Sequence, residues 1–178
     1  MRNHPVRWAV LGVALCVLVP ATVVLGSRLG DDPGRVRSVR VGQRVAPFTL
    51  STIDGETISS GDLSGRVYVV NFWAPWCLPC RREHPALEAF YQRYRGRGVE
   101  LLGVVYNDDA DSARRYRDEL GGDWPLLTDP EFTTALDFGV TGPPETYVVD
   151  STGTITSKWV GAVRAGQLEG EMARIGVS

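Results

Sequence analysis

Hydrophobic positions recur along most of the chain with either a two-residue or a three-to-four-residue period, which predicts strands interleaved with helices. Runs of β-branched and aromatic residues indicate strands at 67–73, 100–106, 124–127, 146–149 and 155–160. Apolar stripes at helical spacing indicate helices after residue 80, at 109–120, at 131–138, and through Leu168, Met172 and Ile175. This order predicts an α/β fold with a central sheet flanked by helices.

Two hairpins frame this pattern. The first has strands at 48–50 and 56–58, with the turn signal Asp54-Gly55 between them. The second joins strands 146–149 and 155–160 near the C-terminus. The globular part is therefore expected to begin at about residue 45.

The first 27 residues have a different character. Residues 8–26 contain no charge and follow Arg2 and Arg7, and a stretch of this length is just sufficient to cross a bilayer. We expect residues 1–27 to be a signal anchor with the rest of the chain outside the cytoplasmic membrane. The alternative is a cleaved signal peptide and a secreted protein. Residues 28–44, rich in glycine and arginine, are expected to be a flexible tether, and residues 45–178 one domain.

Charge and composition narrow the function classes. The chain has 178 residues with 19 basic and 21 acidic side chains, so nothing indicates a surface for nucleic acid. Of its three cysteines, Cys16 lies in the apolar stretch and Cys77 and Cys80 lie close together, which provides no framework of structural disulfides. Neither a metal nor an organic cofactor is expected.

The strongest chemical signal is Trp76-Cys77-Leu78-Pro79-Cys80, between the strand 67–73 and a helical stripe. The N-terminus of a helix has free N–H groups and the positive end of the helix dipole, and both favour a thiolate. Cys77 is therefore predicted to be the nucleophile, with a pKa below the roughly 8.5 of a free cysteine. Cys80, one turn further and more covered, is predicted to be the resolving thiol of a redox-active disulfide.

Two other interpretations of the cysteine pair are weaker. A structural disulfide gains most by closing a long loop, and this pair closes almost none. Half of a zinc site would need further ligands, but the chain has no second CxxC and only His84 lies nearby. Reversible thiol–disulfide exchange is the expected chemistry.

Two stretches resemble a known family. They are residues 70–85, VNFWAPWCLPCRREHP, and residues 139–150, GVTGPPETYVVD. Both resemble the membrane-anchored thiol–disulfide oxidoreductases of cytochrome c maturation, the TlpA, ResA and DsbE/CcmG group, and the second resembles the DsbE branch in particular. The resemblance covers residues 45 to 162 approximately. It implies a thioredoxin-like fold with a central mixed sheet, an N-terminal hairpin and an extra helix–strand insertion at 107–128.

The resemblance also implies a substrate-binding surface. In thioredoxin folds a cis-proline faces the dithiol, and the residue before it pairs through its backbone with the substrate; here these are Pro144 and Pro143. Pro143 has no N–H, so pairing would rely on its carbonyl alone. The alternative for the two prolines is an ordinary turn. Trp76 is expected to flank the thiols, and Glu145 is expected either to contact the substrate or to be a solvated residue at a strand edge.

The proton of the resolving thiol needs an acceptor. Position 71 is asparagine where cytosolic thioredoxins carry a buried aspartate, and an amide cannot accept this proton. Glu83 lies three residues after Cys80 on the same helical face, and it matches an acidic residue of the ResA and DsbE proteins. We expect Glu83 to modulate the thiol pKa values and to shuttle the proton. The alternative is a surface glutamate stabilised by the helix dipole. Trp73 is expected in the core, and His84 in packing or at the surface.

Together these features predict a thiol–disulfide oxidoreductase, and specifically a dithiol reductant. The resemblance implies a disulfide-bearing protein partner, such as apocytochrome c or a haem-ligation factor, and a membrane electron donor of the DsbD/CcdA kind. Pro79 and the uncharged Leu78 favour a reducing couple over an oxidising one. The alternatives are a general extracytoplasmic disulfide oxidase or isomerase, and a non-catalytic module that docks thiol-bearing chains.

Overall fold

The structure, a computed structural model, describes residues 14–20, 22, 35 and 38–177. Its strands are β1 (Thr49–Thr52), β2 (Thr57–Ser59), β3 (Val67–Trp73), β4 (Val99–Val105), β5 (Leu126–Thr128), β6 (Glu145–Val149) and β7 (Ile155–Val160). Its helices within 38–177 are α2 (Leu78–Tyr94), α3 (Ala110–Leu120), α4 (Thr133–Phe138) and α5 (Ala165–Arg174). The alternation of strands and helices confirms the predicted α/β class.

All of these strands form one sheet, in the order β2-β1-β5-β4-β3-β6-β7. The three strands β3, β4 and β5 are parallel, whereas β1, β2, β6 and β7 join through antiparallel pairs. The sheet is therefore mixed, as expected. Because β3 is paired on both sides and covered on both faces, almost every one of its side chains is buried.

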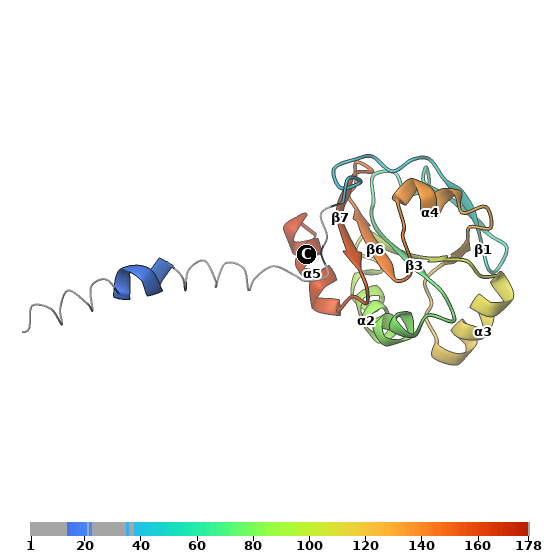
Figure 1. The fold of residues 1–178 in the computed structure, drawn as a ribbon. Helices are drawn as coiled ribbons and strands as arrows, with labels where there is room; N and C mark the ends of the chain where they lie inside the picture. Colours follow the sequence, from blue (N-terminus) through green and yellow to red (C-terminus); the bar gives the residue numbers. More distant parts are fainter. Residues whose placement is uncertain (1–13, 21, 23–34, 36–37, 178) are drawn as a thin grey trace, which may run out of the picture. The chain divides into compact units, whose positions relative to one another are not determined.

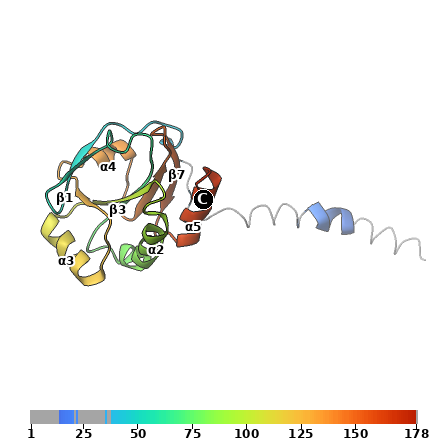
Figure 2. The same cartoon turned by 180° about the vertical axis from the view of Figure 1, so that it is seen from behind.

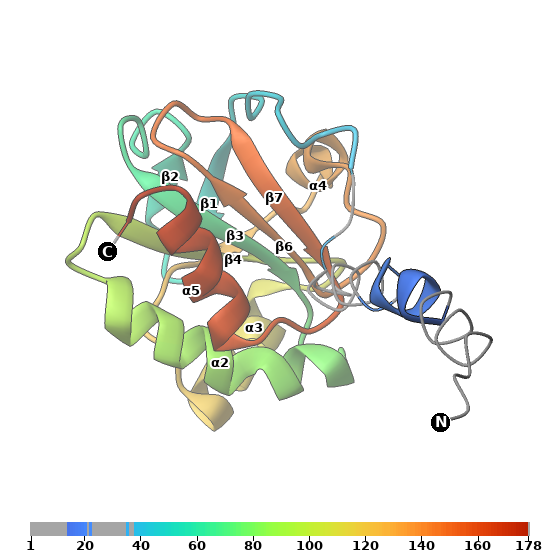
Figure 3. The same ribbon diagram turned by 90° about the vertical axis from the view of Figure 1, so that its left-hand side faces the viewer.

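Helices cover both faces of the sheet. In Figures 1 and 2, α2 and α3 lie against one face and α4 against the other, while Figure 3 shows α5 beside α2. The α4 face is built on aromatic contacts, with Phe72 and Phe138 rings 5.3 Å apart and Tyr147 set edge-on to both. The α2 face is continuous with the two motif cysteines. The two cysteines are thus part of the hydrophobic core on this face of the sheet.

One predicted strand begins two residues later than expected. The apolar run 124–127 predicts a strand from Trp124, but β5 starts at Leu126. Trp124 instead packs against His84 of α2, with the ring centroids 5.1 Å apart. Trp124 is therefore buried by packing outside the strand. Composition alone does not distinguish a tryptophan buried in this way from one that is buried within a strand.

Residues 38–44, predicted to be part of a flexible tether, are instead fixed along the outer edge of β7. The amide of Gly42 donates to the Ile155 carbonyl, and the Ile155 amide donates to Gln43. The Val45 amide donates to Gly153. Further back, Arg35 forms a bridge with Trp159. Among the described residues, the compact unit therefore includes Arg35 and residues 38–44 as well as those from residue 45 on. The tether prediction overlooked the unpaired edge that β7 offers.

The predicted anchor, residues 1–27, lies largely outside the described residues, of which 14–20 and 22 are helical. No helix among the described residues has the length and apolar character needed to span a bilayer.

Candidate active site

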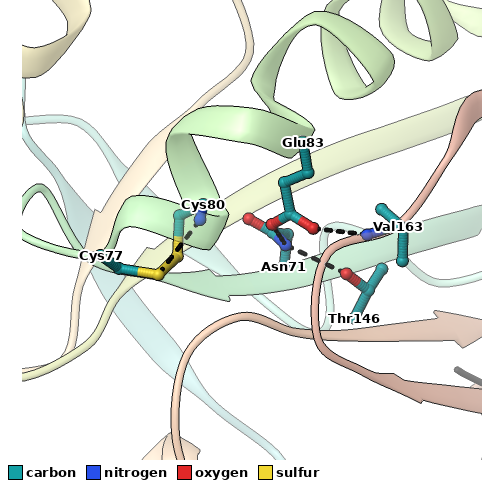
Figure 4. Close-up of a disulfide and its surroundings, with 6 residues drawn as sticks. All are labelled: Asn71, Cys77, Cys80, Glu83, Thr146 and Val163. Atoms are coloured by element: carbon teal, nitrogen blue, oxygen red, sulfur yellow. Dashed lines mark hydrogen bonds between the residues drawn. A yellow bond between two sulfur atoms is a disulfide. The ribbon is translucent and has the colours of Figure 1, made fainter.

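Cys77 and Cys80 lie where β3 passes into α2, and they form a disulfide with the Cα atoms 5.3 Å apart (Figure 4). Cys77 is the N-cap of α2, with an extended backbone at φ −82° and ψ 105°. Its Sγ accepts a hydrogen bond from the Cys80 amide at 3.2 Å. The nucleophile predicted from the sequence therefore occupies the position where N–H groups of the first turn converge.

Pro79 fits this start of the helix. It lies in the first turn, where a missing N–H is no loss and the fixed φ favours helix formation. The helix continues through Pro85 to Tyr94. The chain thus places a sulfur atom at the positive end of α2, which favours the thiolate of Cys77 once the disulfide opens.

The two sulfur-bearing residues are themselves covered, whereas their neighbours are exposed. Cys77 and Cys80 are buried, but Trp76 and Leu78 are 58% and 63% exposed. Large apolar side chains at such exposure on either side of a reactive bond form a surface that another protein chain can contact. Trp76 and Leu78, the sequence neighbours of Cys77, thus provide two exposed apolar groups next to the motif.

Pro143 and Pro144 precede β6, and the peptide bond between them is cis, as the resemblance implied, so the alternative of an ordinary turn is wrong. The register of the sheet pairs Glu145 with Phe72, one residue from the end of β3. The cis-proline therefore lies at the same end of the sheet as the loop that holds Cys77. Pro144 is buried and Pro143 is half-buried.

Glu83 points into the core, so the alternative of a surface glutamate is wrong. Its side chain is 1% exposed. One carboxyl oxygen accepts from Asn71 Nδ2 at 2.9 Å, and the other accepts from the Val163 amide at 2.8 Å (Figure 4). Asn71 also donates to Thr146 Oγ1. Asn71 therefore holds the carboxyl group of Glu83 in place rather than handling a proton itself.

Burial has the largest effect on the pKa of Glu83. It raises the pKa of the carboxyl group to about 7, against the weaker opposing effect of the hydrogen bonds from Val163 and Asn71. A group with such a pKa exchanges protons readily near neutral pH. Glu83 thus combines the position predicted from its spacing with a pKa that suits proton transfer.

Glu145 is neither a solvated residue nor, in this structure, accessible to a substrate, because its side chain is fully buried. It forms an ion pair of 2.8 Å with Lys158 and accepts hydrogen bonds from Tyr147 and Thr141. Burial alone would raise the pKa of Glu145, but the hydrogen bonds from Lys158, Thr141 and Tyr147 together hold it below the usual value. Thr141 is the first residue of the loop that leads to Pro144. The carboxylate of Glu145 therefore holds this loop in place through its hydrogen bonds with Thr141.

Lys158 was missed by the sequence analysis. It is the only lysine of the chain, among 18 arginines, and it lies within a predicted strand. Its ammonium group also donates to the Gly139 carbonyl at 3.0 Å. A single lysine within a predicted strand was the available signal, but the sequence does not show which acidic residue it faces.

Trp73 and His84 lie in the core, as expected. Trp73 packs on Tyr116 of α3, and His84 contacts both Tyr116 and Trp124. Burial lowers the pKa of His84.

Comparisons with known proteins agree with this geometry. Residues 41–158 match the AhpC/TSA family. The chain is 35% identical over 160 residues to the thiol:disulfide interchange protein DsbE of Pseudomonas fluorescens biotype C, covering 88% of this chain and 86% of the relative. It is 29% identical over 156 residues to the thiol-disulfide oxidoreductase ResA of Halalkalibacterium halodurans, covering 87% and 89%.

A solved structure supports the same assignment. The crystal structure of a thiol:disulfide interchange protein of the thioredoxin family from Chlorobium tepidum TLS matches with a TM-score of 0.66 at 27% identity, covering 80% of this chain and all of that one. The thioredoxin-like fold is thereby confirmed, with a disulfide between Cys77 and Cys80 of the CxxC motif at the start of α2. The chain belongs to the AhpC/TSA family and, within it, to the thiol:disulfide interchange proteins of the DsbE type.

Proposed function

We propose that this thiol–disulfide oxidoreductase is a dithiol reductant that works outside the cytoplasmic membrane on a disulfide in apocytochrome c or a related maturation factor. The observation that carries the proposal is the arrangement in Figure 4, a CxxC disulfide capping α2 with the buried carboxyl group of Glu83 one helical turn away.

The reaction begins with the reduced protein. The Cys77 thiolate attacks one sulfur of the client disulfide, a mixed disulfide forms, and the other client sulfur leaves as a thiolate. Cys80 then attacks the Cys77 sulfur, which releases the second client thiolate and closes the Cys77–Cys80 bond. The client gains two electrons and the protein loses two.

Glu83 serves the second step. The Cys80 thiol must lose its proton before it can attack, and an ionised Glu83 is the acceptor that the fold provides one turn away. With a pKa of about 7, this carboxyl group lies about one and a half units below a free thiol at roughly 8.5, so the transfer is only modestly uphill. The proton then leaves with the client thiolate or to solvent.

The direction of electron flow follows from what surrounds the sulfurs. An ionised carboxylate beside the sulfurs destabilises a thiolate and hence the reduced form, which makes the couple more reducing. Leu78 between the cysteines supplies no positive charge that would act in the opposite sense. Both features support a reductant rather than an oxidase.

The partners and the location come from the resemblance. We place the dithiol domain on the outer side of the membrane, tied to it through residues 1–27, and recharged by a membrane electron donor of the DsbD/CcdA kind. The exposed Trp76 and Leu78 and the Pro143–Pro144 loop form the surface on which the client docks.

The test is to trap the mixed disulfide in intact cells. In Cys80→Ser the first step proceeds but the second cannot, so the client stays bound to Cys77. We expect a c-type cytochrome in the adduct, identified by mass spectrometry. The matched control is Cys77→Ser, which should trap nothing. A wide range of secreted proteins in the adduct would favour a general oxidase or isomerase instead.

A measured equilibrium potential against glutathione provides the second test. A thioredoxin-like couple near −270 mV is expected, whereas a couple near the −120 mV of a strong oxidant would contradict the reductant assignment. If Cys77→Ser retained full partner function in cells, a non-catalytic docking module would be the better description.

A further inference from the structure

A small cavity adjoins Cys80 on the α2 face of the sheet. Its volume is about 10 Å³, close to what one water molecule needs. The residues of its wall that have polar or reactive side-chain groups are Asn71, Trp73, Cys80, His84, Tyr116 and Trp124. Asn71 therefore belongs both to this wall and to the hydrogen-bond network of Glu83.

Two polar atoms of the wall residues have no hydrogen-bond partner within the part of the chain that the structure describes. They are Trp73 Nε1 and His84 Nε2. Both side chains are more than nine-tenths buried, at 4% and 7% exposed. Leaving such a group unpaired costs about 1–3 kcal/mol, so native proteins commonly satisfy it with an ordered water molecule.

The two atoms are complementary. An indole nitrogen can only donate. The His84 ring is already hydrogen-bonded to the Leu120 backbone. Since Nε2 has no partner, Nδ1 is the donor to that carbonyl, and in the neutral ring this leaves Nε2 as an acceptor. A water molecule that accepts a hydrogen bond from Trp73 and donates one to His84 has a second hydrogen free for another hydrogen bond.

We propose that the cavity binds one water molecule, which accepts a hydrogen bond from Trp73 Nε1, donates one to His84 Nε2 and donates its second hydrogen to the sulfur of Cys80 when the disulfide is open. The proposal goes beyond the reductant assignment and requires only that the disulfide opens, as thiol–disulfide exchange demands. His84 is thus a positioning residue, which orients the water rather than taking a proton.

A fixed donor of this kind would stabilise the buried Cys80 thiolate without a positive charge. The titratable wall residues besides Cys80 are His84 and Tyr116. From α2, Arg81 and Glu88 act on His84, while Arg81 and Glu83 act on Tyr116, as does Glu119 of α3. Charges of both signs surround the cavity, and each of them also influences the pKa of Cys80. The test must therefore change the side chains that bind the water and keep these charged residues unaltered.

The test measures the Cys80 titration directly. In a background that carries both Cys16→Ser and Cys77→Ser, Cys80 is the one remaining cysteine, and the thiolate absorbance near 240 nm gives its pKa. We expect His84→Phe, which keeps a ring but removes the acceptor, to raise this pKa by about one unit, a tenfold loss of thiolate at neutral pH. His84→Gln restores an acceptor and should recover part of the shift.

The matched control is Leu87→Met, an apolar wall residue of similar volume, which should leave the pKa unchanged. If His84→Phe does not fold, Trp73→Phe removes the other partner of the water and should raise the pKa in the same direction. A high-resolution crystal structure of the unaltered protein should show the water bound to Trp73 and His84.

A dry cavity in that crystal structure would overturn the proposal. So would a Cys80 pKa that is the same in the parent and in the folded His84→Phe or Trp73→Phe variant. The measurement needs no client protein, so it separates this proposal from the identity of the client, which only the trapping experiment tests.

Discussion

Glu83 shows how the location of a residue, rather than its type, sets its chemistry. A glutamate in the first turns of a helix is ordinarily ionised at neutral pH and solvated. Here the loop after β7 brings the Val163 amide against the carboxyl group from 80 positions away in the sequence. The spacing from Cys80 predicted that the two residues share a face of α2. The burial could not be predicted, because it depends on a distant loop.

The pH dependence of stability should report this burial. The pKa of Glu83 is about 7 in the folded protein against 4.5 ordinarily, so the folded state binds the extra proton between these values. Stability must then fall as the pH rises from about 4.5 to about 7, by at most roughly 3 kcal/mol. Glu83→Gln should abolish this fall. Denaturant unfolding of the oxidised protein at a series of pH values measures it.

The exposed Glu131 supplies the control for that experiment. Glu131→Gln should keep the pH profile of the unaltered protein. If Glu83→Gln also kept it, the carboxyl group would not carry the raised pKa, and the proton-transfer role proposed for it would lose its support.

At the scale of single elements, local sequence predicted most of the structure. The strands β3, β4, β6 and β7 and the helix α3 lie within one or two residues of their predicted positions, and α2 and α5 form where apolar stripes predicted helices, because long periodic patterns determine them. Asp109 caps α3 through its side chain, and Gly121 follows the last residue of that helix. The short elements were less accurate. α4 starts at Thr133 rather than at residue 131, because Phe132 takes a left-handed conformation.

Helix α5 permits a direct test of backbone energetics. Gly170 lies in its interior, and an added Cβ would meet nothing within 4 Å. Gly170→Ala should therefore raise the free energy of unfolding by about 0.5–1 kcal/mol, since alanine loses less conformational entropy. Thermal and denaturant unfolding would measure the change.

Gly176, just beyond α5, is the matched control. It also has open space around it, but its φ of +81° is unfavourable for alanine. Gly176→Ala should lower stability by about 1 kcal/mol. Two substitutions of the same chemistry should thus have opposite signs, and a shift in the same direction for both would contradict the backbone assignment.

At the scale of the whole molecule, the pairing of segments that are distant in the sequence determines which residue is the first of the folded domain. The thioredoxin-like order of the strands followed from the resemblance, not from periodicity, because periodicity does not specify which strands are neighbours. The same limit explains the error over residues 38–44. Their composition resembles a linker, but they meet a strand edge that only the folded sheet presents.

Two shortened variants should test that boundary. A variant that begins at residue 34 keeps the backbone hydrogen bonds to 153–155 and the Arg35–Glu171 ion pair of 3.3 Å. A variant that begins at residue 46 loses them and exposes the edge of β7. We expect it to be about 2 kcal/mol less stable and more prone to aggregate. Equal stability and solubility of the two would show that the segment contributes nothing to the fold.

The ion pair beneath the Pro143–Pro144 loop has a practical consequence. Lys158 provides the only side-chain amine of the chain, and it is 6% exposed and held by Glu145. Amine-directed acylating reagents, which need an uncharged and accessible nitrogen, would find this group only during transient opening of the sheet between β6 and β7. The rate of acylation at Lys158 would therefore report how often the sheet opens between β6 and β7, and the measurement needs no added label.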